Sequence, residues 1–114
     1  MSVKINRREV GEVTVVDLNG RLTLGDASAQ LRDTLRELLE KGQKKIVLNL
    51  GQVGYIDSSG LGELVSGFTT VKNQGGQLKL ANLTQKVNDL LTITKLYTVF
   101  EVHNDEKAAV QSFS

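Results

Sequence analysis

Short strand-like runs alternate with amphipathic, helix-spaced segments along the whole chain. This alternation limits the possible folds more than any other feature of the sequence. Residues 13–18 form a β-branched run, and residues 3–10 predict a weaker, partly exposed strand before it. Only Gly11 and Glu12 separate the two runs, so they predict an antiparallel hairpin.

Three further strands are expected later in the chain. Residues 46–50 are dense in Ile, Val and Leu, which is typical of a strand buried on both faces. Residues 78–80 alternate between apolar and polar, and residues 99–102 form the last strand-like run. We expect residues 20–25 to form a loop and residues 51–56 to form a connection.

Four helices are predicted from capping residues and from apolar residues three or four positions apart. Asp26 and Ser59 are expected to cap the first two helices, and Thr84 and Asp105 the last two. The residues expected to face the core are Leu31, Leu35, Leu38 and Leu39 in the first helix, Leu61, Leu64, Val65, Phe68 and Val71 in the second, Val87, Leu90 and Leu91 in the third, and Ala109, Val110 and Phe113 in the fourth.

The resulting order, β-β-α-β-α-β-α-β-α, predicts an α/β fold. Alternating strands and helices favour parallel pairing through crossover helices. We therefore expect a mixed, mostly parallel sheet of about five strands, with an N-terminal antiparallel hairpin and about four helices. The 114 residues contain no proline and no linker-like stretch, so residues 1–114 are expected to form a single domain.

Composition argues against several classes of function. The net charge of +1 lacks the basic excess of a nucleic-acid binder, and the absence of cysteine excludes disulfides and thiolate chemistry. A single histidine, His103, is expected to lie in solvent at the end of the last strand, which makes a catalytic triad or a transition-metal site improbable. The P-loop pattern is absent, and Val65 replaces the third glycine of a dinucleotide fingerprint.

We therefore expect that the chain is not an enzyme and that it binds no cofactor or metal of its own. Its longest apolar runs are too short to cross a bilayer, and its basic first residues are not followed by the apolar segment of a signal peptide. The expected location is the cytoplasm, without direct membrane insertion.

The segment Asp57-Ser58-Ser59-Gly60 stands out because it places two hydroxyls and a carboxylate between a buried strand and a helix. One interpretation is structural: Ser59 caps the helix and Asp57 favours its positive end. The other interpretation concerns Ser58, just ahead of that cap. A phosphate there would add about −1.5 to −2 charge and three acceptor oxygens, and the helix N-terminus would tolerate it. The fold would stay intact while the choice of docking partner changed.

The wider pattern is more specific than this segment alone. It consists of Lys45-Ile46-Val47-Leu48-Asn49-Leu50, then Tyr55-Ile56-Asp57-Ser58-Ser59-Gly60-Leu61-Gly62, Asn73-Gln74-Gly75-Gly76 and Leu78-Lys79-Leu80-Ala81-Asn82-Leu83. Over nearly its whole length, the sequence resembles the STAS family, and specifically the bacterial anti-sigma-factor antagonists. The resemblance implies that Ser58 is the phosphoacceptor of an anti-sigma factor that is also a serine kinase and that uses ATP and Mg²⁺. The unphosphorylated chain would bind that kinase and release a sigma factor, and a serine phosphatase would restore the hydroxyl.

The family pattern also implies a partner interface formed by the serine motif and the loop before the first helix, which is expected to lie beside Ser58. One position departs from the pattern, because Thr23 stands where the family loop usually has an acid. This departure bears on the identity of the partner and on the efficiency of phosphorylation. The residues expected at the interface are Leu22, Thr23, Leu24, Gly25, Asp26, Asp57, Ser58, Ser59, Gly60, Leu61 and Gly62.

Two other functions remain open from the sequence. A STAS domain without a phosphorylation cycle can serve as a scaffold subunit of a signalling or membrane-transport assembly, which does not need an exposed serine. The third hypothesis is a small-molecule or nucleotide binder, because Gly60 and Gly62 would let a ligand approach the start of the helix. A complex that is insensitive to Ser58→Asp favours the scaffold, and titration with ATP and GTP tests the ligand binder.

Overall fold

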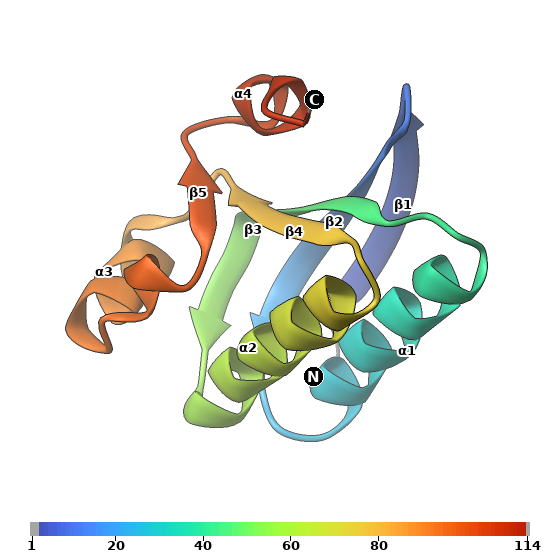
Figure 1. The fold of residues 1–114 in the computed structure, drawn as a ribbon. Coiled ribbons are helices and arrows are strands. Elements are labelled where there is room, and N and C mark those ends of the chain that lie inside the picture. The colour runs from blue at the N-terminus through green and yellow to red at the C-terminus, as the bar shows by residue number, and fades with distance from the viewer. Residues whose placement is uncertain (1–2, 114) are drawn as a thin grey trace.

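The computed structural model describes residues 3–113. Their five strands form one sheet in the order β1-β2-β3-β4-β5. β1 (Lys4–Val10) runs antiparallel to β2 (Val13–Leu22), as the short gap between them predicts. β3 (Lys45–Ile56), β4 (Gln77–Ala81) and β5 (Glu101–His103) each pair in parallel with the strand before them. The predicted mixed, mostly parallel sheet is confirmed (Figure 1).

Three helices pack on one face of the sheet, and a short fourth helix packs on the other. α1 (Asp26–Glu40), α2 (Ser58–Asn73) and α3 (Gln85–Ile93) share the main core. Because successive strands lie side by side, right-handed crossovers place these three connecting helices on the same face. α4 (Glu106–Gln111) covers a smaller apolar cluster on the opposite face. No helix within residues 3–113 is both long enough and apolar enough to cross a membrane.

The core-facing sides of the helices agree with the sequence prediction, although some predicted core residues are only half-buried. The central strand β3 is buried on both faces, since Ile46, Val47 and Leu48 are fully buried and point alternately to the two clusters. The buried helix residues are Leu31, Leu35, Leu38, Leu39, Leu61, Leu64, Val71, Val87, Leu91 and Ala109, and the half-buried ones are Val65, Phe68, Leu90, Val110 and Phe113.

β2 and β3 are longer than the sequence predicts. Their ends pair with each other as far as Leu22 and Ile56, so both strands continue to these residues. The prediction of a loop at residues 20–25 is therefore wrong for its first three positions, and the prediction of a connection at residues 51–56 is wrong throughout. This long pairing carries the two strand ends to one side of the molecule, where the serine motif begins.

The far edge of the sheet also differs from the prediction. β5 begins at Glu101, whereas Val99 lies in the turn after a single 3₁₀ turn, η1 (Leu96–Thr98). On β4, Lys79 is buried beneath the C-terminal segment, where its Nζ donates to the Ser112 hydroxyl at 2.7 Å. Nζ also lies 2.8 Å from a carboxylate oxygen of Glu101. A buried ammonium needs such partners, and they tie the segment after α4 to the sheet.

Candidate functional site

The start of α2 is held by the carboxylate of Asp57 and not by Ser59. Oδ1 of Asp57 accepts a hydrogen bond from the backbone N–H of Gly60 at 2.7 Å, and Oδ2 accepts one from the N–H of Leu24 at 3.0 Å. Asp57 is therefore the N-cap, and the helix begins at Ser58. The prediction that Ser59 caps this helix is wrong, because Asp57 satisfies the same helix N-terminus and is itself fixed by the neighbouring loop.

The strand end before α1 lies directly against the start of α2. The carbonyl oxygen of Leu22 accepts a hydrogen bond from the N–H of Asp57 at 3.3 Å. A Cβ placed on Gly60 would lie only 2.0 Å from this carbonyl oxygen and 2.8 Å from the carbonyl carbon of Leu22. Only a residue without a side chain allows the helix to approach the strand this closely. The expected proximity of the loop and the serine motif is thus present in the structure.

α1 starts without a side-chain cap. Its N-cap is Gly25, which has a φ of 100°, and Asp26 is the first helical residue. The prediction that Asp26 caps α1 is therefore wrong, although an acid in the first turn still favours the helix dipole. The loop is closed instead by the hydroxyl of Ser28, which donates to the carbonyl oxygen of Thr23 at 3.0 Å.

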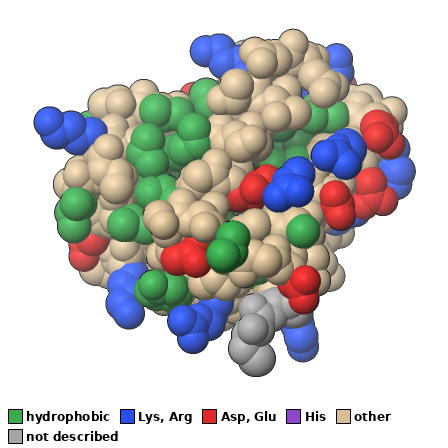
Figure 2. Space-filling model, turned by 90° about the horizontal axis from the view of Figure 1, so that it is seen from below, with side chains coloured by type: hydrophobic (Ala, Val, Ile, Leu, Met, Phe, Trp, Pro, Cys, Tyr) green, Lys and Arg blue, Asp and Glu red, His purple; other side chains and the backbone are tan. Residues whose placement is uncertain are grey.

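Most of the predicted interface residues lie on the surface, but three do not. Ser58 is exposed, Leu24 is 77% exposed, and both lie at the end of the molecule where β2 and β3 terminate. Figure 2 views the protein from this end, where hydrophobic and acidic side chains both reach the surface. Thr23, Gly25, Asp26, Asp57, Ser59 and Gly62 are exposed or half-buried, whereas Leu22, Gly60 and Leu61 are buried.

The burial of Leu22 and Leu61 corrects the predicted interface. Leu22 is completely buried and Leu61 is 7% exposed, so both side chains belong to the core. Their positions in the motif and in the adjoining loop suggested contact with a partner, whereas the helix and the strand turn them inward. They support the site from below, and of the predicted set only the eight exposed or half-buried residues lie at the surface.

The carboxylate of Asp57 is stabilised in its charged form. The N–H groups of Gly60 and Leu24 both donate to it, and these hydrogen bonds lower the pKa of Asp57 below its usual value. The same charge lies next to the Ser58 hydroxyl in the chain. At neutral pH the site therefore presents one fixed negative charge beside an exposed hydroxyl, with both attached to the start of a helix.

Replacing Asp57 by asparagine is expected to make stability less dependent on pH. Because folding lowers the pKa of Asp57, the ionised carboxylate stabilises the fold above the pKa of the unfolded chain, which is about 4. This contribution is lost as pH falls through the still lower pKa of the folded state. Asp57→Asn should thus be less stable than the parent at neutral pH, and the difference in unfolding free energy should shrink in acid. Urea denaturation at several pH values measures it.

Asp33→Asn is the matched control for this experiment. Asp33 lies exposed on α1, and its nearest cation, Arg36, is 3.9 Å away across a solvated pair, an arrangement that contributes little. We expect this variant to follow the parent at every pH. Asp57→Asn would contradict this expectation if it were as stable as the parent, or less stable by the same free energy at every pH. Either result would mean that the ionised carboxylate of Asp57 does not stabilise the contact between the loop and the helix.

Among the described residues, the side chains that could bind a metal do not gather into a cluster. Within residues 3–113, no three His, Cys, Asp or Glu side chains meet as a metal ion requires. His103 lies on β5, half-buried, with Nε2 2.6 Å from a carboxylate oxygen of Glu101. His103 thus ends the last strand, as predicted, but it is half-buried and paired with a carboxylate and does not lie wholly in solvent. Its partner Glu101 also contacts Lys79, so the histidine belongs to the ion pairs at the sheet edge.

One feature beside the serine motif was not predicted from the sequence. A mainly apolar groove opens between the end of β3 and α3, and Tyr55, Ile56 and Leu90 contribute to its walls. The usable signal was Tyr55, a large aromatic residue immediately before the motif. The sequence predicts a connection at residues 51–56, whereas pairing with β2 makes them strand and orients Tyr55.

The fold and the motif agree with what comparison with known proteins shows. The family model of the STAS domain matches residues 4–109, and the chain belongs to this family. Over 111 residues it is 32% identical to the anti-sigma-B factor antagonist of Bacillus subtilis (strain 168), which covers 97% of this chain and 100% of that relative. The predicted membership is thus confirmed.

Two solved structures have the same fold as this chain. A Thermotoga maritima protein provisionally assigned as an anti-sigma factor antagonist superposes with a TM-score of 0.86 at 27% identity, covering 94% of this chain and 92% of that one. The Bacillus cell fate determinant SpoIIAA in its phosphorylated form gives a TM-score of 0.72 at 21% identity, covering 95% and 98%. The second likeness concerns the fold alone.

Proposed function

We propose that this protein is an anti-sigma-factor antagonist regulated by phosphorylation of Ser58. In its unphosphorylated form it binds an anti-sigma factor that is also a serine kinase, and a sigma factor is thereby released. Phosphorylation of Ser58 strongly weakens this binding, and a serine phosphatase restores the hydroxyl. The observation that carries the proposal is the exposed Ser58 at the first position of α2, directly after the capping carboxylate of Asp57.

The position of Ser58 suits a reversible charge switch. A phosphate on this residue would lie at the positive end of α2, where partial charges and free N–H groups favour an anion. The neighbouring carboxylate of Asp57 opposes it, but that carboxylate is already engaged by two backbone N–H groups. We therefore expect the domain to remain folded after modification. The added charge acts on the partner, because a surface that accommodated a hydroxyl would have to accommodate about two negative charges.

The remaining elements of the proposal concern what the partners supply. ATP and Mg²⁺ belong to the kinase, so this chain is a protein substrate with no cofactor and no catalysis of its own. Residues 1–114 act as a single STAS domain, and the cycle takes place in the cytoplasm. The partner surface consists of Thr23, Leu24, Gly25, Asp26, Asp57, Ser58, Ser59 and Gly62, which are exposed or half-buried.

The direct test is a phosphorylation assay with residue-level mapping. The purified chain is incubated with the serine-kinase anti-sigma factor encoded in the same genome, with ATP and Mg²⁺, and the phosphate is located by mass spectrometry. We expect one phosphate on Ser58. Ser58→Ala should bind the kinase but take up no phosphate, whereas Ser59→Ala, the matched control, should still be phosphorylated.

The alternatives predict different outcomes of the same assay. A tight complex without phosphate would make the chain a non-switching scaffold subunit. Phosphate on Ser59 or elsewhere would refute the assignment of Ser58. Saturation by ATP or GTP alone, at concentrations found in cells, would favour the ligand-binding hypothesis.

A further inference from the structure

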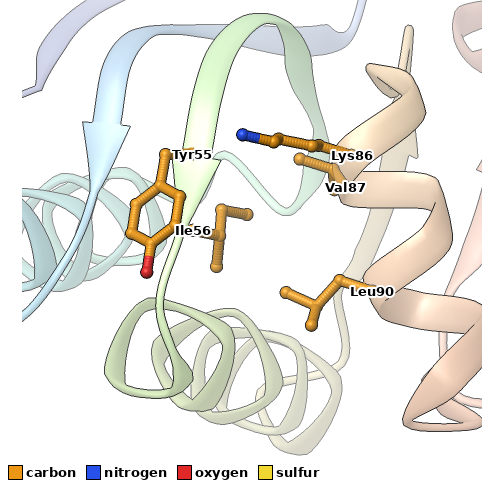
Figure 3. A pocket seen from close by; sticks show the side chains of 5 residues that line it. All are labelled: Tyr55, Ile56, Lys86, Val87 and Leu90. Atoms are coloured by element: carbon orange, nitrogen blue, oxygen red, sulfur yellow. The ribbon is translucent and has the colours of Figure 1, made fainter.

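The groove next to the serine motif is formed by two elements that meet at the end of the sheet. Tyr55 and Ile56, the last two residues of β3, form one side of the groove. Lys86, Val87 and Leu90 contribute from α3. Its volume is about 190 Å³, enough for one large side chain. Figure 3 shows the Tyr55 ring and the Lys86 side chain on opposite sides of the opening, with Leu90 lower on the α3 side.

The groove combines an apolar interior with a cationic rim. Four of the five lining residues carry apolar or aromatic side chains, and none carries a carboxylate. Lys86 is exposed and makes no ion pair among residues 3–113. The guanidinium of Arg21, which does not line the groove itself, lies 4.8 Å from the centre of the Tyr55 ring and places a second cation next to this wall. An apolar side chain with a carboxylate beside it would satisfy both the interior and the rim.

The groove is continuous with the proposed partner surface. Tyr55 and Ile56 immediately precede Asp57 and Ser58 in the chain. An interface of ordinary size covers about 800 Å² on each partner, so a protein seated over Ser58 extends well beyond the serine motif and its loop. Interface centres are apolar, and Figure 2 shows hydrophobic side chains gathered toward the left of this end, the side on which α3 lies in Figure 1. The partner is thus expected to extend over the groove.

We propose that this groove seats an apolar side chain of the same anti-sigma factor, flanked by an acidic residue that pairs with Lys86. The proposal rests on the function proposed above and adds a division of roles. The groove contributes the part of the affinity that is common to the phosphorylated and unphosphorylated forms. Ser58 alone determines the difference between them, because the phosphate is added outside the groove.

The test uses charge reversal at Lys86. Lys86→Glu should fold normally, because Lys86 is exposed and lies in the first turn of α3, where an acid favours the helix dipole. The dissociation constant for the serine-kinase anti-sigma factor of the same genome is measured for the parent and the variant, each with and without phosphate on Ser58. We expect Lys86→Glu to weaken both forms by the same factor, about tenfold, and to leave the ratio between the forms unchanged.

Lys107→Glu is the matched control, since it makes the same charge change at an exposed position on α4, on the opposite face of the sheet. It should bind as the parent does. If Lys86→Glu also binds as the parent, the groove is not a contact, while phosphorylation of Ser58 can still uphold the proposed function. If only the unphosphorylated form is weakened, the division of roles is wrong. If Lys86→Glu abolishes self-association of the chain and leaves kinase binding unchanged, the occupant of the groove is a second copy and the proposal is overturned. If the parent does not bind the kinase at all, both proposals fail together.

Discussion

Gly60→Ala is expected to destabilise the domain by more than about 3 kcal/mol. A methyl group at this position would lie 2.0 Å from the carbonyl oxygen of Leu22, well inside contact distance. The obstacle is backbone, so no side-chain rotation relieves it. Leu22 is also completely buried and paired with Ile56, so moving its carbonyl would disturb the end of the central sheet. Urea denaturation measures the change in unfolding free energy.

Gly62→Ala provides a control on the same helix. A Cβ on Gly62 meets nothing within 4 Å, and alanine is favoured over glycine inside a helix by about 1 kcal/mol. We therefore expect Gly62→Ala to stabilise the protein slightly. Two glycines that are two residues apart should thus respond with opposite sign. Equal, small effects would mean that the strand end yields easily and that the close approach of α2 is not a rigid part of the site.

Ser58→Asp is expected to weaken binding to the kinase by at least about 30-fold, which corresponds to about 2 kcal/mol. The substitution places a permanent charge where the bound partner meets a hydroxyl, and an unpaired charge in an interface is costly. The domain itself should stay folded, because an acid at the first position of a helix interacts favourably with the helix dipole. Titration calorimetry against the kinase, together with urea denaturation of the free chain, separates the two effects.

Ser66→Asp makes the same chemical change at an exposed position farther along α2. It should alter binding far less than Ser58→Asp does. If the Ser58→Asp chain bound as tightly as the parent, the charge switch would be refuted and the non-switching scaffold favoured. A comparable loss from Ser66→Asp would point to a general effect of charge on α2 and not to a contact at Ser58.

The order of the elements and two of the helix caps could be predicted from sequence because their signals are local. The side chains of Thr84 and Asp105 accept hydrogen bonds from the N–H groups of Val87 and Ala108, at 3.3 and 2.8 Å. In both cases a capping residue stands directly before a helix-spaced apolar pattern. The hairpin of β1 and β2 followed in the same way from the short gap between two strand-like runs.

The predictions that failed depend on contacts between distant parts of the chain. Asp57 and Ser59 are both acceptable caps by residue type. In the folded protein Asp57 is the cap, and its carboxylate also accepts a hydrogen bond from the N–H of Leu24, which is distant in sequence. Asp26 was displaced as a cap by Gly25, whose positive φ turns the chain before α1. The extension of β3 to Ile56 requires the partner strand β2. None of these relations has a local sequence signal.

The candidate site was predicted in part for the same reason. The motif identified Ser58 and the neighbouring loop, and the structure brings Asp57 and Leu24 into contact. Sequence alone did not separate the residues that support the site from those that reach the surface. Leu61 lies inside the motif but points into the core, whereas Leu24, outside the motif, is 77% exposed. That separation depends on the rotation of α2 against the sheet.

The consecutive order of the five strands has a consequence for how the chain reaches its fold. Each strand pairs with the strand next to it in sequence, so no pairing has to wait for a segment from the far end of the chain. Loop-closure entropy rises with the length of chain enclosed, and each pairing here encloses only the stretch between two successive strands. The sheet can therefore be assembled from β1 toward β5 as the chain lengthens. The serine motif, between the third and fourth strands, is formed before the last strand is added.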